Sequence, residues 1–147
     1  MKVLLVCSLG GHLTQMETLL PAFDGHEVAW VTYRGGRMPT GPGRVHLLDN
    51  FGLRPWRYLR GLGQARRILD EERPDLVVST GSEVALPFFL RARRRGIPTV
   101  FVESISRVST PSGTGRLLYP VADHFFVQWE RLLPRYGKRA RFAGGVL

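Results

Sequence analysis

Cysteine, lysine and long apolar runs are scarce in this sequence of 147 residues. Cys7 is the only cysteine, which excludes a disulfide framework and a cysteine metal site, and a reducing cytoplasm is the expected setting. The apolar run that follows Lys2 is too short for a signal peptide or a membrane span. The longest run, "VALPFFL", ends in arginines. The sequence therefore predicts a chain that does not cross a membrane, although it can rest on one.

Negative charge and metal-ligand spacing are also scarce. The formal net charge is +9, and Lys2 and Lys138 are the only lysines, so almost all of the positive charge is arginine. A basic chain suits phosphate-bearing partners such as nucleic acid, an anionic membrane or a phosphorylated substrate. We expect no nucleic-acid partner, because no binding motif or aromatic stacking platform is present. The remaining histidines outside "SLGGHL" show no ligand spacing, so neither a metal nor a cofactor is predicted.

Strand-like and helix-like segments alternate along the chain. Short apolar runs predict strands near residues 2–8, 26–33, 44–48, 75–80, 97–103 and 123–128. Helices are predicted over 12–23, 54–72, 83–95, 115–122 and 129–136, and 140–147 is either a last strand or a tail. This alternation predicts an α/β fold with a doubly wound parallel sheet. The length is that of one domain, which we expect to cover residues 1–147.

Ligands of such sheets bind outside the carboxyl ends of the strands, so the residues after each strand are the candidates. The first turn, "SLGGHL", combines Ser8, Gly10 and Gly11 with His12. Its glycines permit a close backbone approach, and the helix start that follows suits a phosphate. The turn lacks both the GxGxxG fingerprint and a P-loop lysine, which disfavours a stand-alone nucleotide enzyme. A tight turn with a solvent-facing histidine is the alternative reading.

Two further strand ends carry candidate residues. Gly81 and Ser82 follow the predicted strand 75–80 and form either a second phosphate cradle or only a helix start, with Ser82 as its N-cap. Glu103 directly follows the buried run "TVFV". A carboxylate there can bind a hydroxyl or orient a base, or it can form a salt bridge, for example to Arg107.

The helix predicted over 54–72 carries arginines near one side and aromatic residues at its start. The side chains in question are Arg54, Trp56, Arg57, Arg60 and Arg67. A basic helix with aromatic side chains can lie on an anionic bilayer, or it can simply be solvated. The arginines at 91–95 are a second candidate for a membrane contact.

Four segments together carry a resemblance to a known family. In order along the chain they are "SLGGHLTQM", "STGSEVALPFFL", "FVESISRV" and "GRLLYPVADHFFVQW". This set resembles the acceptor-side subunit of the split UDP-N-acetylglucosamine transferase. Relatives of that subunit act in lipid-linked oligosaccharide, exopolysaccharide and capsule synthesis. It is also similar to the N-terminal half of the single-chain transferase of peptidoglycan synthesis.

The resemblance implies a Rossmann-like domain, the N-terminal half of a GT-B glycosyltransferase. It implies that Ser8, Gly10, Gly11, Gly81 and Ser82 meet a polyprenyl-diphosphate-linked acceptor, with His12 or Glu103 as the general base. A partner chain would supply the UDP-sugar half, so the chain is expected to be inactive alone and the tail "RFAGGVL" to help dock the partner. The expected location is the cytoplasmic face of the cell membrane, as a peripheral protein. A non-catalytic scaffold that recruits such a partner to membranes is the competing hypothesis.

Overall fold

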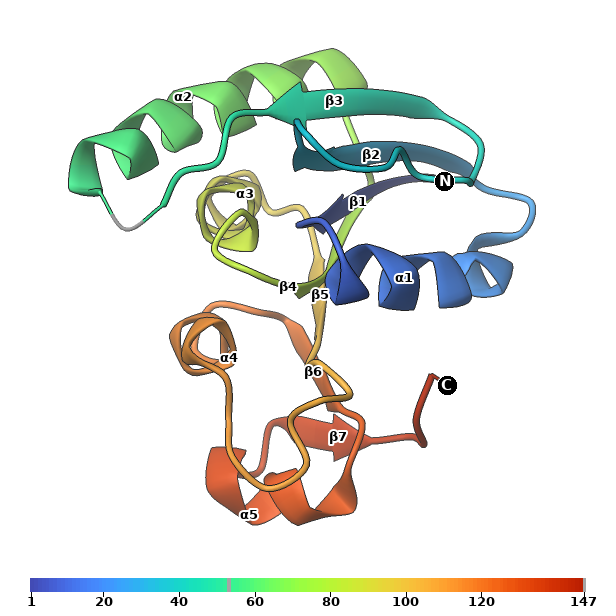
Figure 1. The fold of residues 1–147 in the computed structure, drawn as a ribbon, viewed down its shortest axis with the longest axis vertical. Coiled ribbons are helices and arrows are strands. Elements are labelled where there is room, and N and C mark those ends of the chain that lie inside the picture. The colour runs from blue at the N-terminus through green and yellow to red at the C-terminus, as the bar shows by residue number, and fades with distance from the viewer. Residues whose placement is uncertain (53, 147) are drawn as a thin grey trace.

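The computed structural model describes residues 1–52 and 54–146. Seven parallel strands form one sheet in the order β3-β2-β1-β4-β5-β6-β7 (Figure 1). The strands are β1 (Lys2–Cys7), β2 (Glu27–Tyr33), β3 (Arg44–Leu48), β4 (Leu76–Gly81), β5 (Thr99–Val102), β6 (His124–Val127) and β7 (Ala140–Phe142). The chain order reverses between β1 and β4, which confirms the predicted doubly wound parallel sheet.

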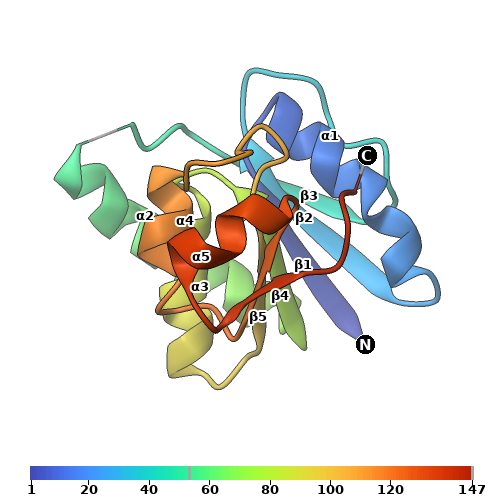
Figure 2. The same ribbon diagram turned by 90° about the horizontal axis from the view of Figure 1, so that it is seen from below.

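Helices connect the strands and cover the two faces of the sheet unequally. They are α1 (Gly11–Thr18), α2 (Pro55–Glu72), α3 (Ala85–Arg94), α4 (Gly113–Leu118) and α5 (Leu133–Tyr136), with 3₁₀ turns η1 (Leu20–Phe23) and η2 (Glu130–Leu132). Figure 2 shows α1 on one side of the sheet and α2, α3, α4 and α5 on the other. The C-terminal segment lies on the α1 side.

The first strand shows why both faces are buried. Side chains alternate between the faces of a strand, and β1 is apolar at every position from Val3 to Cys7. Leu4 and Val6 join the core beneath α2 and α3, whereas Val3, Leu5 and Cys7 pack with Leu13 and Met16 of α1. The continuous apolar run in the sequence therefore reflects two cores, one on each side of the sheet.

The elements agree with the sequence prediction except at several helix ends. α4 ends at Leu118 rather than residue 122, and the helix predicted over 129–136 is divided into η2 and α5. The first predicted helix ends at Thr18 rather than residue 23. A separate 3₁₀ turn begins at Leu20, and Pro21 in its first positions has no N–H with which to continue the α-helix. α4 begins at Gly113 rather than residue 115, because the Ser112 hydroxyl caps it by accepting from the Gly115 amide (2.8 Å). The prediction of Ser82 as an N-cap was wrong: α3 begins at Ala85 after Val84, without a side-chain cap.

The connections place the candidate residues at the carboxyl edge of the sheet. Each parallel crossover returns the chain to the opposite edge, so the turns after β1, β4, β5 and β6 all lie together. Within the described residues, no helix has both the length and the apolar character needed to cross a bilayer.

Candidate functional site

Two glycine turns meet at the centre of the carboxyl edge. β1 pairs with β4, and Cys7 lies opposite Gly81, so the turn after β1 lies beside the turn after β4. Gly10 has φ 72° and ψ −135°, a conformation that only glycine adopts without strain. Gly81 and Ser82 also have positive φ values, 123° and 74°. The predicted neighbourhood of Gly10 and Gly81 is therefore present, and both turns depend on unusual backbone conformations.

His12 links the two turns. Its Nδ1 lies 2.9 Å from the carbonyl oxygen of Thr80, and the Thr80 hydroxyl donates to the His12 carbonyl oxygen at 2.7 Å. A carbonyl oxygen can only accept, so Nδ1 carries the proton. A Cβ on Gly81 would lie 2.8 Å from Cε1 of the imidazole, so the ring occupies space that only a glycine leaves free. In a neutral ring this arrangement leaves Nε2 with its lone pair.

The first turn also leads into helix amides that have no partner within α1. The amides of Gly11, His12 and Leu13 open α1, and the first hydrogen bond of the helix runs from the Thr14 amide to Gly10 O. Helix geometry gives the three earlier amides no partner within the helix, and the helix dipole makes this end positive. Gly10 and Gly11 are exposed and Ser8 is partly exposed. An anionic group can therefore reach this end of the helix.

Glu103 lies after β5 and is only 1% exposed. Its Oε1 accepts from the Ser104 amide (2.8 Å), and its Oε2 accepts from the Ser112 amide (3.1 Å), the Ser112 hydroxyl (2.9 Å) and the Tyr136 hydroxyl. The carboxylate thus faces α4 and α5 rather than His12. Burial, and then the Glu103 carboxylate, raise the pKa of Tyr136 above its usual range. The role of Glu103 toward an acceptor stays a prediction, and the observed contacts of its carboxylate are structural.

A second buried polar cluster was not predicted from the sequence. Gln15 of α1 accepts from the Ile105 amide (3.0 Å) and from Nε2 of Gln128 (2.7 Å). Gln128 Nε2 also donates to the Glu103 carbonyl oxygen (2.8 Å), and its Oε1 accepts from the Val146 amide (3.0 Å). Gln15 and Gln128 are almost fully buried, so these bonds hold α1, two strand ends and the C-terminal segment together. Gln128 directly follows β6, near the end of the segment "GRLLYPVADHFFVQW", and its place after a strand is the only sequence signal for it.

Two acidic residues hold neighbouring loops. Glu83, inside the motif "STGSE", accepts from the Tyr33 hydroxyl (2.9 Å) and from the Ser82 hydroxyl. Glu17 of α1 forms a two-pronged ion pair with Arg37, with both N–O distances at 2.7 Å, and accepts from the Thr40 amide (2.9 Å). The Arg37 guanidinium is the main cause that lowers the pKa of Glu17 to about 2. These contacts fasten the turn after β4 to β2, and the β2–β3 loop to α1.

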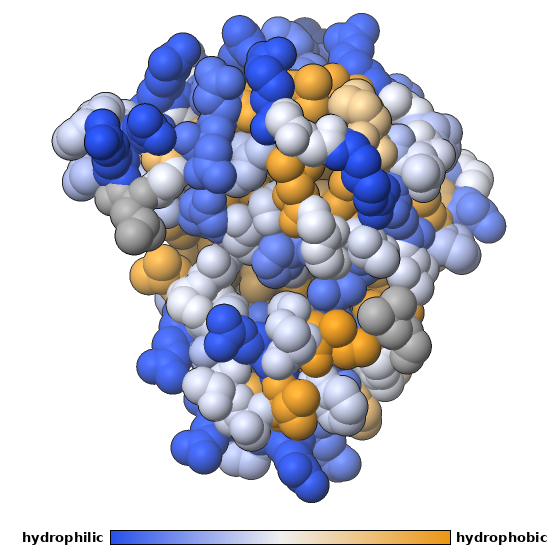
Figure 3. Space-filling model, viewed as in Figure 1, coloured by the Kyte–Doolittle hydropathy of each residue, from blue (hydrophilic) through white to orange (hydrophobic). Residues whose placement is uncertain are grey.

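The basic face of α2 is exposed as the sequence predicted. Arg54, Arg57, Arg60 and Arg67 are all exposed, and Trp56 is 62% exposed, with the Arg54 guanidinium 5.5 Å from the centre of its ring. Leu59 nearby is 71% exposed. On the face seen in Figure 3, hydrophilic side chains surround smaller apolar areas. This region lies at the start of α2, the longest helix.

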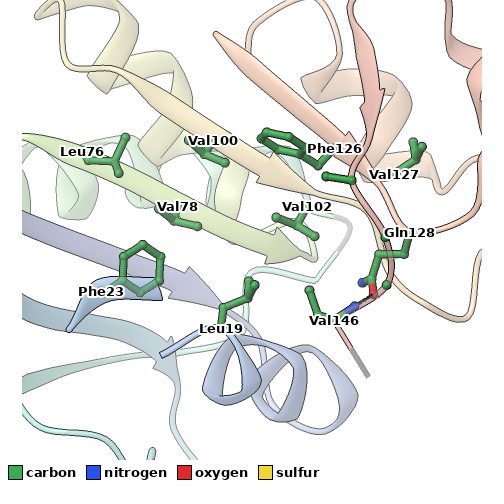
Figure 4. Close-up of a pocket in the computed structure, with 13 residues that line it drawn as sticks. Leu19, Phe23, Leu76, Val78, Val100, Val102, Phe126, Val127, Gln128 and Val146 are labelled. Carbon is green, nitrogen blue, oxygen red and sulfur yellow. Dashed lines mark hydrogen bonds between the residues drawn. The ribbon is translucent and has the colours of Figure 1, made fainter. Parts of the chain in front are cut away.

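An apolar groove lies on the α1 side of the sheet. It has a volume of about 260 Å³ and lies between the end of α1 and the C-terminal segment (Figure 4). Leu19, Phe23, Val78, Val100, Val102 and Phe126 line it, together with residues 143–146. The groove marks the part of the sheet that α1 does not cover.

Comparison with known proteins supports a family assignment. The family model described as "Oligosaccharide biosynthesis protein Alg14 like" matches residues 55–146. The UDP-N-acetylglucosamine transferase subunit ALG14 of Eremothecium gossypii is 41% identical over 90 residues, covering 57% of this chain and 39% of that protein. The human subunit of the same name is 36% identical over 77 residues, covering 48% of this chain and 36% of that protein. The chain therefore matches less than half the length of these curated relatives.

Longer proteins are also similar over most of this chain. The UDP-N-acetylglucosamine--N-acetylmuramyl-(pentapeptide) pyrophosphoryl-undecaprenol N-acetylglucosamine transferase of Clostridium botulinum is 31% identical over 140 residues, covering 84% of this chain and 38% of that enzyme. The crystal structure of Acinetobacter baumannii MurG superposes with a TM-score of 0.80 at 21% identity, covering 99% of this chain and 46% of MurG. These likenesses confirm the Rossmann-like, GT-B type of fold. Together with the family match, they show that this chain belongs to the Alg14-like family of oligosaccharide biosynthesis proteins.

Proposed function

We propose that this chain is the acceptor-side subunit of a two-component glycosyltransferase. The complete enzyme would move a sugar, most simply N-acetylglucosamine, from a UDP-sugar to a polyprenyl-diphosphate-linked acceptor. The family assignment supports the reaction class, and the names of the relatives support the sugar. The whole chain, residues 1–147, would form the single acceptor-side domain. The arrangement of His12 at the meeting point of the two glycine turns is the observation that supports the proposal most.

His12 is the general base in this proposal. Its Nδ1–H is held by the Thr80 carbonyl oxygen, which fixes the ring and leaves Nε2 able to accept a proton. Nε2 would take the proton of the acceptor hydroxyl as the hydroxyl oxygen attacks the anomeric carbon of the sugar. The bond from that carbon to the diphosphate of UDP breaks, and UDP leaves. Glu103 would shape the neighbouring loop, because all of its observed contacts are internal.

The glycine turns would hold the acceptor diphosphate. Gly10 and Gly11 leave the α1 amides open, and the partly exposed Ser8 lies at the mouth of this turn. Gly81 and Ser82 form the neighbouring turn, which a diphosphate bound at α1 would reach. Amide donors and a helix dipole can stabilise this charge without a metal ion.

The UDP-sugar would bind to a partner chain that forms the second GT-B half. The groove beside residues 143–146 exposes apolar side chains of three strands, and we propose that the partner packs against the C-terminal segment there. Without the partner the active site would be incomplete, so the isolated chain would be inactive. A role in the synthesis of a bacterial exopolysaccharide or capsule would suit such an enzyme.

The membrane contact would be made by the start of α2, on the cytoplasmic face of the cell membrane. Trp56, Arg60 and Arg67 recur at helical spacing and share a face. An exposed tryptophan among arginines suits an anionic bilayer surface. Trp56→Ala should weaken binding to phosphatidylglycerol vesicles about tenfold in a co-sedimentation assay, whereas Trp129→Ala should not change it. Equal binding of Trp56→Ala and the parent chain would exclude this contact.

The decisive experiment combines this chain with its partner. Purified complex is assayed for transfer from UDP-N-acetylglucosamine to polyprenyl-diphosphate acceptors, with His12→Gln and the exposed His124→Ala as the variant and its control. We expect a fall in kcat of at least about 100-fold for His12→Gln, the usual size of a lost general base, and parental activity for His124→Ala. Absence of any sugar transfer with the parent complex would refute the transferase proposal.

A non-catalytic scaffold is the second candidate, and one observation favours it. Glu103, one of the two predicted catalytic residues, is buried in structural contacts. If His12→Gln and Glu103→Gln both retain full activity in an assembled complex that transfers sugar, the scaffold interpretation is correct.

A further inference from the structure

A polar pocket with a volume of about 400 Å³ lies outside the glycine turns, between the loop before α4 and the two short helices α4 and α5. It is lined by Ser109, Thr110, Pro111, Arg116 and Arg135. Figure 1 places α4 and α5 at the same end of the molecule. The pocket therefore combines two guanidinium groups and two hydroxyl groups, with no acidic side chain in its lining.

Both arginines of the pocket are exposed, and neither has an ion-pair or hydrogen-bond partner among the side chains and carbonyl groups of residues 1–52 and 54–146. Other arginines nearby are engaged. Arg139 donates to the Tyr119 carbonyl oxygen (3.2 Å), and Arg93 donates to the Pro120 carbonyl oxygen (2.9 Å). Two neighbouring cations that repel each other and face one cavity are stabilised by an anion between them.

The walls of this pocket are anchored by the buried Glu103. Oε2 of Glu103 accepts from the Ser112 amide and hydroxyl at the start of α4, and from the Tyr136 hydroxyl of α5. These bonds connect the two sides of the pocket. Arg116 follows Ser112 by about one helical turn, and Arg135 directly precedes Tyr136. Gly115 permits this closeness, because a Cβ there would collide with Tyr136 and Glu103. One carboxylate thus holds together the two segments that carry Arg116 and Arg135.

We propose that this pocket binds a phosphate or diphosphate group. Arg116 and Arg135 donate paired N–H bonds to its oxygens, and the Ser109 and Thr110 hydroxyls donate to the remaining ones. Guanidinium groups match phosphate geometry, and charge-assisted hydrogen bonds of this kind are about twice as strong as neutral ones. The lining of this pocket does not include His12, and the proposal does not depend on the transferase proposal. The diphosphate can belong to a nucleotide or to a polyprenyl lipid, since both offer the same chemistry.

The test uses inorganic pyrophosphate as the probe and follows the arginine side-chain Nε resonances of the full chain by NMR. We expect the Arg116 and Arg135 signals to shift together and to saturate. Arg116→Ala and Arg135→Ala should each weaken the apparent affinity at least about tenfold, and Arg116→Lys should give an intermediate loss. Arg66→Ala removes the same charge from the exposed face of α2 and should leave the affinity unchanged.

Titrations with UDP and with farnesyl diphosphate distinguish a nucleotide from a lipid as the source of the diphosphate. The one that binds more tightly than pyrophosphate identifies the source. His12→Gln should not change the shifts at Arg116 and Arg135, which separates this pocket from the glycine turns. The proposal is overturned if neither arginine signal shifts, or if Arg66→Ala weakens binding as much as Arg116→Ala. Failure of sugar transfer in the complex would leave these binding results unaffected.

Discussion

Glu103→Ala provides the most direct test of how the site is built. The substitution removes an acceptor from four donors, namely the Ser104 amide, the Ser112 amide, the Ser112 hydroxyl and the Tyr136 hydroxyl. Each buried donor left without a partner costs about 1–3 kcal/mol. Water entering the vacated space would satisfy part of the set, so the lower figure applies, and four donors give a loss of about 4 kcal/mol. This is a large part of the 5–15 kcal/mol typical of a folded domain.

Urea denaturation of the isolated chain measures this loss. With an m-value of about 2 kcal/mol/M, the midpoint should fall by about 2 M, and the melting temperature should fall by about 8–16 °C. Glu103→Gln retains one acceptor oxygen, so its urea midpoint should lie between that of the parent chain and that of Glu103→Ala. Glu130→Ala removes an exposed carboxylate from the same chain and serves as the control. An unchanged midpoint for Glu103→Ala, together with lost sugar transfer in the complex, would refute this reasoning and make the carboxylate a group that acts on substrate.

Three other substitutions or treatments test separate contacts. Gly81→Ala should lower the free energy of unfolding by about 1–3 kcal/mol in urea denaturation and reduce sugar transfer by about tenfold or more. The new Cβ would collide with the imidazole of His12, and the residue has a positive φ. Gly63→Ala, which has open space around it, should be at least as stable as the parent. Glu17 has its pKa lowered to about 2 from an unfolded value near 4.5, so its stabilising effect is complete above pH 4.5 and is lost as the pH falls toward 2. Because the guanidinium of Arg37 is 46% exposed, we expect the ion pair to contribute only about 1 kcal/mol to the free energy of unfolding. Between pH 6 and pH 2.5, Glu17→Gln should therefore lose less stability than the parent chain does. Burial is the main cause that raises the pKa of the Cys7 thiol to about 12. A thiol reagent should therefore react at pH 8 with the unfolded chain and not with the native one. Equal reaction rates in both states would contradict the burial of this thiol.

The order of strands and helices could be predicted because each element carries its own local pattern. The apolar run of β1 and the helical spacing of Leu13 and Met16 in α1 can both be recognised from a few neighbouring residues of the sequence. Helix ends were less predictable. The Ser82 hydroxyl donates to Glu83 instead of capping α3, and Glu83 also accepts from Tyr33 of β2, a contact that no local pattern shows.

The site could be predicted only as a set of strand ends. The parallel topology brings the turn of Gly10 beside the turn of Gly81, and that followed from the alternation of elements. The direction of the Glu103 side chain did not follow, because its donors are Ser112 and Tyr136, which lie 9 and 33 residues away. The partnership of Gln15 with a residue 113 positions later was equally outside the reach of any local pattern.

Gln15 and Gln128 connect α1, the strand ends and the C-terminal segment through uncharged amides. An amide has no proton to gain or lose over the range in which proteins remain folded, and salt screens its dipole far less than it screens an exposed ion pair. The Glu17 contact to the β2–β3 loop, in contrast, weakens in acid. Changes in acidity or ionic strength should therefore loosen the rim of the carboxyl edge while its centre, including the helix that carries His12, keeps its shape.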